Sequence, residues 1–108
     1  MSKNKRKQES NYYFIGKDID KTKLKRNAPL VGVPNTNIDF YEVKSGIFHR
    51  RRKINKFGIA EKDLDAPDKH KSYFEVHDYI NVVHQRGRKP NKKEEVEYNK
   101  ARKKRRPY

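Results

Sequence analysis

The sequence predicts a small α+β protein, built as a three- to four-stranded antiparallel meander with short helices and basic, partly disordered termini. The middle of the chain alternates runs of β-branched and aromatic residues with glycine-containing turns, a pattern typical of strands joined by hairpins. Only 31% of the 108 residues are hydrophobic, so the chain can build one thin core. This composition excludes a large enzyme with a deep apolar pocket.

The strands are marked most clearly in the centre of the chain. Residues 38–43 form the first predicted strand, and a glycine-containing hairpin loop follows it. Residues 47–54 form the second strand, and residues 59–65 return as the third after another glycine turn. A fourth candidate strand covers residues 73–77.

The second predicted strand carries four consecutive basic residues. Because side chains alternate along a strand, Arg50 and Arg52 are expected on one face, with Arg51 and Lys53 on the other.

The two ends differ from the centre in composition. Residues 1–10 are polar and basic after the initial methionine and predict a disordered arm. Residues 11–86 are the predicted α+β domain, and residues 87–108 are a basic C-terminal helix or tail. A helix is expected to begin there at Asn91, because Glu94 lies three residues later and completes a capping-box pattern.

The charge of the chain favours nucleic acid as a partner. Lys and Arg number 29 against 14 Asp and Glu, a net charge of +15. The seven tyrosines and five phenylalanines can stack on unpaired bases, which favours RNA. Insertion into a membrane is not expected, since no basic helix has a broad apolar face. The residues expected to bind nucleic acid are Arg50, Lys53, Arg86, Arg88, Lys89, Arg102, Lys103, Lys104, Arg105 and Arg106.

Aspartates and histidines gather between residues 63 and 78, shortly after the arginines. Cleavage of a phosphodiester needs a base for the attacking hydroxyl, an acid for the leaving oxygen and cations at the phosphoryl oxygens. His77 and His70 are predicted as the acid–base pair, whereas His49 and His84 are interpreted as surface or core residues. The complete catalytic set predicted is His77, His70, Arg51, Arg52 and Asp65. In this set the arginines stabilise the phosphoryl charge and Asp65 orients a histidine.

This chemistry needs no cofactor, although the same cluster can hold a divalent metal through Asp63, Asp65 and His70. Thiolate zinc sites, iron–sulfur clusters and disulfides are excluded because the chain has no cysteine. The other interpretation of the cluster is a solvated turn whose acids offset neighbouring lysines.

A series of short motifs follows one order from residue 32 to residue 79. The series is Gly32-Val33-Pro34-Asn35, Asp39-Phe40-Tyr41, Gly46, Arg50-Arg51-Arg52, Gly58, Asp63-Leu64-Asp65, His70 and Val76-His77-Asp78-Tyr79. This order resembles a small C-terminal nuclease-like toxin domain of bacterial polymorphic toxins, which also occurs as a stand-alone protein near mobile elements. The family closes on Pro-His-x-His, whereas this chain has Val76 before the first histidine and Tyr79 in place of the second.

The resemblance implies a small α+β fold and a bacterial effector. Such an effector is secreted and acts in the cytoplasm of a target cell, or is cytoplasmic if a phage encodes it. The positive charge of the chain also suits an acidic protein partner, such as an immunity protein.

Three functions are consistent with these observations. The first is a nucleic-acid-directed toxin domain, a ribonuclease rather than a deoxyribonuclease, that works by His/Arg acid–base chemistry. The alternative is a non-catalytic phage or ribosome-associated protein that binds nucleic acid through its basic residues. A third function is an interaction protein whose charge targets an acidic protein. Cleavage of nucleic acid that depends on His77 distinguishes the ribonuclease from the two non-catalytic functions.

Overall fold

The computed structural model describes residues 12–17, 19–22, 29–67 and 73–103. Within them the chain forms seven strands and one helix. The strands are β1 (Tyr12–Gly16), β2 (Ile19–Thr22), β3 (Asn37–Glu42), β4 (Phe48–Ile54), β5 (Ala60–Asp65), β6 (Glu75–Ile80) and β7 (Val83–Arg88), and the helix is α1 (Lys92–Ala101). In the described part of the chain, no helix is long and apolar enough to cross a membrane.

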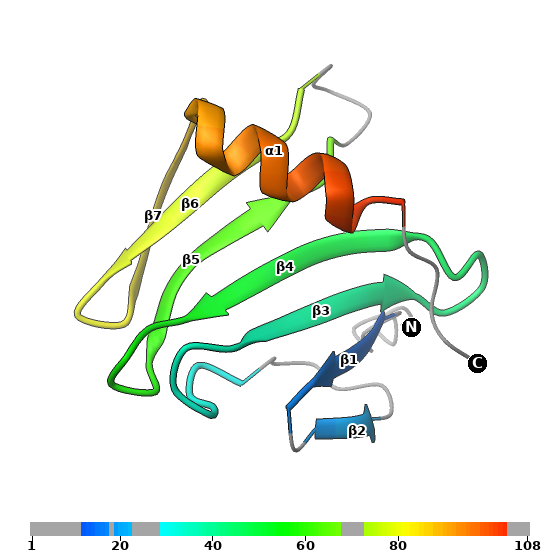
Figure 1. The fold of residues 1–108 in the computed structure, drawn as a ribbon, viewed down its shortest axis with the longest axis horizontal. Coiled ribbons are helices and arrows are strands. Elements are labelled where there is room, and N and C mark those ends of the chain that lie inside the picture. The colour runs from blue at the N-terminus through cyan, green and yellow to red at the C-terminus, as the bar shows by residue number, and fades with distance from the viewer. Residues whose placement is uncertain (1–11, 18, 23–28, 68–72, 104–108) are drawn as a thin grey trace, which may run out of the picture.

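All seven described strands belong to one antiparallel sheet in the order β2-β1-β3-β4-β5-β6-β7. From β3 to β7 each strand pairs with the next strand in the sequence, so this part is a simple meander. The sheet is twisted, and α1 lies across one of its faces (Figure 1).

The predicted fold class is wrong. The protein is mostly β, with a seven-stranded sheet and a single described helix, rather than an α+β meander of three or four strands with short helices. The predicted central strands correspond to β3, β4 and β5, and the fourth to β6. The predicted disorder of residues 1–10 lies outside the described residues.

The strand that sequence reasoning missed near the C-terminal end is β7. It follows β6 through a two-residue turn at Asn81 and Val82, which have φ angles of 52° and 59°. Asn is common at such a position, but a β-branched residue with positive φ is rare. The turn therefore lacks its usual Asn-Gly signature, and β7 itself is polar.

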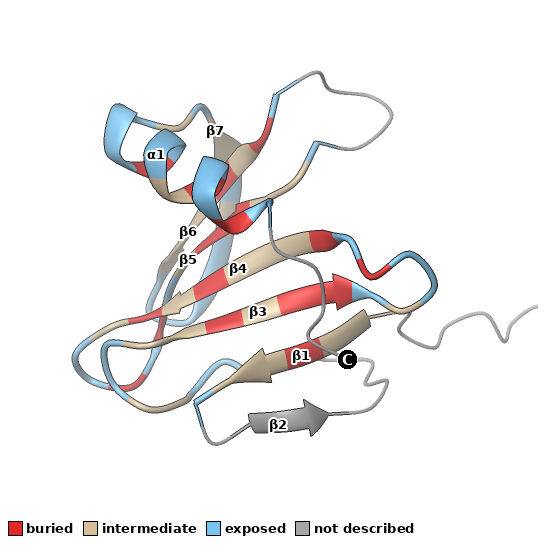
Figure 2. Cartoon of the chain, turned by 45° about the vertical axis from the view of Figure 1, so that its right-hand side comes forward, coloured by how far each residue is buried: buried red, intermediate tan, exposed pale blue. Residues whose placement is uncertain are grey.

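Both faces of the sheet carry apolar side chains, and the buried residues concentrate on the central strands and under α1 (Figure 2). On the helix side the buried cluster is Tyr41, Phe48, Leu64, Phe74, Val76, Tyr98 and Ala101. On the opposite side it is Phe14, Ile38, Phe40 and Ile54. The ring of Tyr98 stacks on Phe74 with 4.0 Å between centroids, which fixes α1 against the end of β6.

The helix begins with the predicted capping box, which is confirmed. The Asn91 side chain accepts from the Glu94 amide at 2.8 Å, and the Glu94 carboxylate accepts from the Asn91 amide at 2.8 Å. The same carboxylate also accepts from Lys62 Nζ at 2.6 Å and from Arg88 Nη2 at 2.8 Å. Glu94 thus caps the helix and joins it to β5 and β7.

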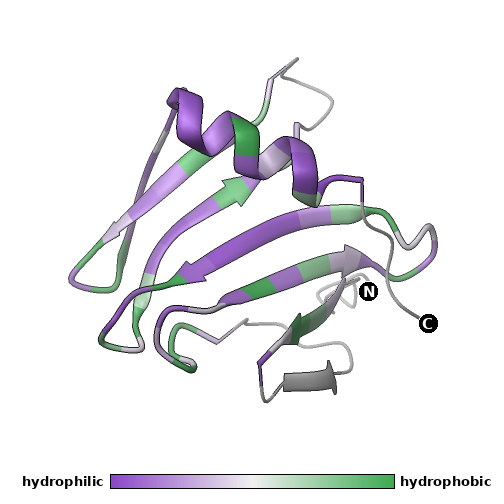
Figure 3. Ribbon diagram, viewed as in Figure 1, coloured by the Kyte–Doolittle hydropathy of each residue, from purple (hydrophilic) through white to green (hydrophobic). Residues whose placement is uncertain are grey.

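A second glutamate joins the helix to β4. Glu97 Oε2 accepts from Lys53 Nζ at 2.8 Å and from Arg51 Nη1 at 3.1 Å. Arg51 and Lys53 therefore lie on the helix side of the sheet, and the predicted alternation along β4 is confirmed. Figure 3 shows that α1 is mostly hydrophilic, so these ion pairs supplement a small apolar contact.

We expect Glu94→Gln to lower the free energy of unfolding by about 2 kcal/mol at neutral pH, because Lys62 and Arg88 lose their charged partner. Hydrogen bonds from Arg88 above all, with Lys62 and the Asn91 amide, lower the pKa of Glu94 from 4.5 to about 2. A carboxyl with a lowered pKa contributes stability above its unfolded value and loses it as the pH falls. Urea unfolding of the wild type should therefore show a loss of stability from pH 4.5 towards pH 2, and Glu94→Gln should flatten it.

The matched control is Glu95→Gln, which removes an exposed carboxylate from the same turn of α1. It should change the free energy of unfolding by less than about 0.5 kcal/mol. Equal effects of the two variants would show that Glu94 does not join the helix to the sheet.

Candidate active site

Two of the arginines of β4 lie on the face opposite the helix, and one of them is fully enclosed. Arg52 is 5% exposed and Asp63 is 0% exposed, and two hydrogen bonds of 2.8 and 2.9 Å join them. Arg52 also donates to the Tyr79 hydroxyl at 2.8 Å and to the Pro29 carbonyl at 2.9 Å. The guanidinium predicted to stabilise a phosphoryl group therefore has protein partners on several sides.

Tyr79 closes this network. Its hydroxyl accepts from Arg52 and donates to Asp63 Oδ2 at 2.8 Å. Burial, together with the charge of Asp63, raises the pKa of Tyr79 to about 12, so the hydroxyl keeps its proton at neutral pH. Asp63, predicted as a metal ligand, is occupied by these two partners.

Arg51, the other arginine of the predicted catalytic set, lies on the helix side of the sheet. It donates to both oxygens of Asp39 at 2.8 and 2.9 Å, besides Glu97. The hydrogen bonds to Asp39 raise the pKa of Arg51 above its already high value. The sheet thus separates Arg51 from His77, and the structure does not bring these two predicted residues together.

His77 and Asp65 do meet, at one end of the face opposite the helix. They line a cavity of about 140 Å³ whose walls are His49, Arg50, Asp65, Ala66, Pro67, Tyr73, Glu75 and His77. Arg50 donates from Nε to Asp65 Oδ1, and its side chain is 28% exposed. Arg50 is therefore the arginine of β4 that lines this cavity.

The orientation of the His77 ring defines which nitrogen is available. Nδ1 lies 2.9 Å from the Gln85 carbonyl oxygen, which can only accept, so Nδ1 carries a proton. Nε2 lies 3.4 Å from Asp65 Oδ2 and 3.4 Å from Glu75 Oε1. Nε2 is therefore the ring atom that can take up a proton or bind a cation.

Gly87 makes room for one of these carboxylates. It pairs with His77 across β6 and β7, and a Cβ added to it would lie 2.5 Å from Glu75 Cδ. The absence of a side chain at this position lets the Glu75 carboxylate lie beside the His77 ring.

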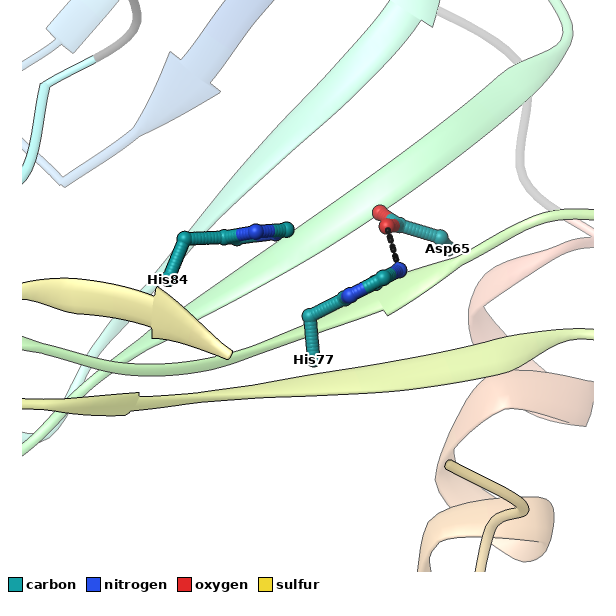
Figure 4. Close-up of side chains that lie close together, drawn as sticks. All are labelled: Asp65, His77 and His84. Carbon is teal, nitrogen blue, oxygen red and sulfur yellow. Dashed lines mark ion pairs between the residues drawn. The ribbon is translucent and has the colours of Figure 1, made fainter. Parts of the chain in front are cut away.

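His84 is a further member of the cluster, and sequence reasoning gave it no role. Its ring stacks on His77 with 4.4 Å between centroids, and burial and the neighbouring His77 lower its pKa. Figure 4 shows the side chains of His77, His84 and Asp65 directed towards one region. The signal that could have identified His84 is the two-residue turn, which pairs it with Tyr79.

His49 lies in another wall of the cavity and was also given no role. Its ring stacks on Tyr12 with 4.2 Å between centroids. Burial first, and then the positive charge of Arg50, lower the pKa of His49, so it is neutral at pH 7.

The remaining residues predicted to act in catalysis or to bind nucleic acid do not gather at this cavity. His70, Lys104, Arg105 and Arg106 lie outside the described residues. Lys53 is bound to Glu97, and Arg88 is bound to Glu94 and Asp78. The exposed members of the predicted nucleic-acid set are Arg86, Lys89, Arg102 and Lys103.

Comparison of the chain with protein-family models, with curated proteins and with solved structures found no match. The resemblance to a toxin nuclease domain therefore stays a prediction from the sequence motifs. The function has to be inferred from the chemistry of the site.

Replacement of Arg52 should test its structural role. We expect Arg52→Met to lower the free energy of unfolding by about 3 kcal/mol or more, because it leaves the Asp63 carboxylate buried without its cation. Arg50→Met should cost no more than about 1 kcal/mol, since water can reach that pair. Urea unfolding of both variants at pH 7 measures the difference. An Arg52→Met protein that is as stable as the wild type but has lost RNA affinity would restore Arg52 as a phosphate ligand.

Proposed function

We propose that this protein binds nucleic acid, RNA in preference to DNA, and cleaves its phosphodiester bonds at the cavity that holds His77. One observation carries the proposal. The His77 ring is fixed by the Gln85 carbonyl so that Nε2 faces the cavity, with the Asp65 carboxylate beside it. A histidine with one nitrogen held by a carbonyl and the other facing a cavity is an arrangement that general base catalysis uses.

The proposed reaction uses the 2′ hydroxyl of RNA as the nucleophile. The 2′ oxygen forms a bond to phosphorus while the bond from phosphorus to the 5′ oxygen breaks, which leaves a cyclic phosphate. The proton of the 2′ hydroxyl passes to His77 Nε2, and the leaving 5′ oxygen takes a proton from water. The hydroxide that remains then removes the proton from His77, which restores the neutral imidazole. DNA lacks this hydroxyl, so the chemistry itself selects RNA.

Two charged groups support His77 in this proposal. Asp65 lies 3.4 Å from Nε2 and stabilises the imidazolium that forms when the proton arrives. Arg50 lines the same cavity and supplies positive charge for the phosphoryl oxygens. Arg50 thus takes the role that the sequence predicted for Arg51 and Arg52, whose side chains are bound to other residues.

A path for the RNA strand runs beside the cavity. Tyr73 is 42% exposed and borders both the His77 cavity and a larger groove of about 440 Å³, which lies between α1 and the residues just before β6 and just after β7. Lys89 and Arg102 line this groove, and the Lys89 ammonium lies 5.9 Å from the Tyr73 ring centroid. An exposed aromatic ring beside cations suits an unpaired base and its phosphates.

Labelled single-stranded RNA and DNA of one base sequence, incubated with the protein in EDTA, test the proposal. We expect the wild type to cleave RNA but not DNA, and His77→Gln to reduce the rate at least about 100-fold. His77→Gln should keep the wild-type melting temperature within a few degrees and its RNA affinity within about twofold, because only Nε2 loses its function.

Three results would contradict the proposal. RNA binding without cleavage would favour the non-catalytic alternative, and cleavage by His77→Gln at the wild-type rate would exclude His77 as the base. Cleavage that appears only after a divalent metal is added would exclude proton transfer to His77 Nε2 as the mechanism.

A further inference from the structure

The environment of His77 Nε2 is unusual for a neutral imidazole. With the proton on Nδ1, Nε2 carries a lone pair, and one carboxylate oxygen of Asp65 and one of Glu75 each lie 3.4 Å from it. The lone pair of Nε2 therefore lies close to two carboxylate oxygens. Either a proton on Nε2 or a cation between them satisfies this arrangement.

The distances favour a cation larger than a proton. A charge-assisted N–H···O bond is about 2.7–2.9 Å long, shorter than both separations. In a tetrahedral zinc site, metal–ligand bonds of about 2.0–2.1 Å place two ligand atoms about 3.3 Å apart. The 3.4 Å between His77 Nε2 and Asp65 Oδ2 is close to this edge of a coordination tetrahedron.

A second imidazole is present at the same place. One ligand atom from each of Asp65, His77 and His84 lies within 4.8 Å of the other two. The three residues come from the adjacent strands β5, β6 and β7, and their side chains point towards one region (Figure 4). His84 is exposed, so its ring can rotate by the small amount that a common metal requires.

The hydrogen-bond partners of His77 and Asp65 are of the kind that orient metal ligands in proteins. A histidine that binds a metal usually donates its other ring N–H to a carbonyl or carboxylate, as His77 Nδ1 does to Gln85. A carboxylate ligand is usually held by a further hydrogen bond, as Asp65 Oδ1 is held by Arg50. Both contacts leave His77 Nε2 and Asp65 Oδ2 to the metal.

We infer that Asp65, His77 and His84 form a three-residue Zn²⁺ site. Two imidazoles with a carboxylate suit zinc, whereas calcium and magnesium take oxygen ligands. This set differs from the one predicted by sequence, because Asp63 is bound to Arg52 and His84 takes a ligand position.

Zinc binding does not require that the protein cleaves RNA. Bound zinc should nevertheless affect cleavage, because Nε2 of His77 cannot bind a metal and accept a proton at the same time. Zn²⁺ should therefore inhibit the cleavage that proceeds in EDTA. This is a regulatory property of the proposed function, whereas zinc binding itself is measured without RNA.

Calorimetric titration of Zn²⁺ into the EDTA-treated and desalted full chain tests the site. We expect one Zn²⁺ per chain, and at least a tenfold weaker affinity in both His77→Gln and His84→Gln. The matched control is His49→Gln, which removes an imidazole from the same cavity outside the cluster and should bind as the wild type does. Co²⁺ in place of Zn²⁺ should give the visible absorption of a tetrahedral site, which the two weakened variants lose.

Absence of a one-to-one site, or equal affinity in His49→Gln and His84→Gln, would overturn the inference. The variants also separate it from the proposed function. His84→Gln should weaken zinc binding whether or not the protein cleaves RNA, so zinc binding is measured independently of turnover. If Zn²⁺ binds as expected but activates cleavage, the zinc site stands and proton transfer to His77 is wrong.

Discussion

The buried pair of Arg52 and Asp63 is the constraint on which the rest of the sheet depends. It joins β4 to β5, and Tyr79 extends it to β6. Removing two charges from water is costly, so such a pair is tolerated only where its hydrogen bonds are complete. A shift of register in any of these strands would break them. Because Asp65 follows Asp63 by two residues and His77 precedes Tyr79 by two, the register that satisfies the buried pair also brings the site residues together.

The basic run of β4 serves both faces of the sheet. Arg51 and Lys53 bind acids on the helix side, while Arg50 and Arg52 bind aspartates on the other side. Much of the positive charge in the centre of the sheet is therefore matched by carboxylates that are distant in sequence. The charge available to a polyanion lies elsewhere, at exposed residues such as Lys89 and Arg102 beside the groove.

Local patterns in the sequence predicted the local features of the structure. The capping box of α1 and the alternation along β4 depend on residues a few positions apart, and both are confirmed. Strand β7 was not predictable in this way, because Val82 stands in the turn before it where a glycine is usual. His84 was missed for the same reason. The partners of Arg51 and Arg52 lie 11 to 46 residues away, so their roles depend on a sheet register that the sequence pattern does not specify.

The meander has a consequence for the order in which the protein folds. Asp65, His77 and His84 lie on β5, β6 and β7, which are consecutive in the sequence and adjacent in the sheet, so their pairing joins residues close together in the chain. The contact between α1 and β4 joins Arg51 to Glu97, 46 residues apart, and its closure costs more chain entropy. We therefore expect the hairpins to form first and the helix to dock late in the transition. The reactive side chains would then be assembled before the opposite face of the sheet is covered.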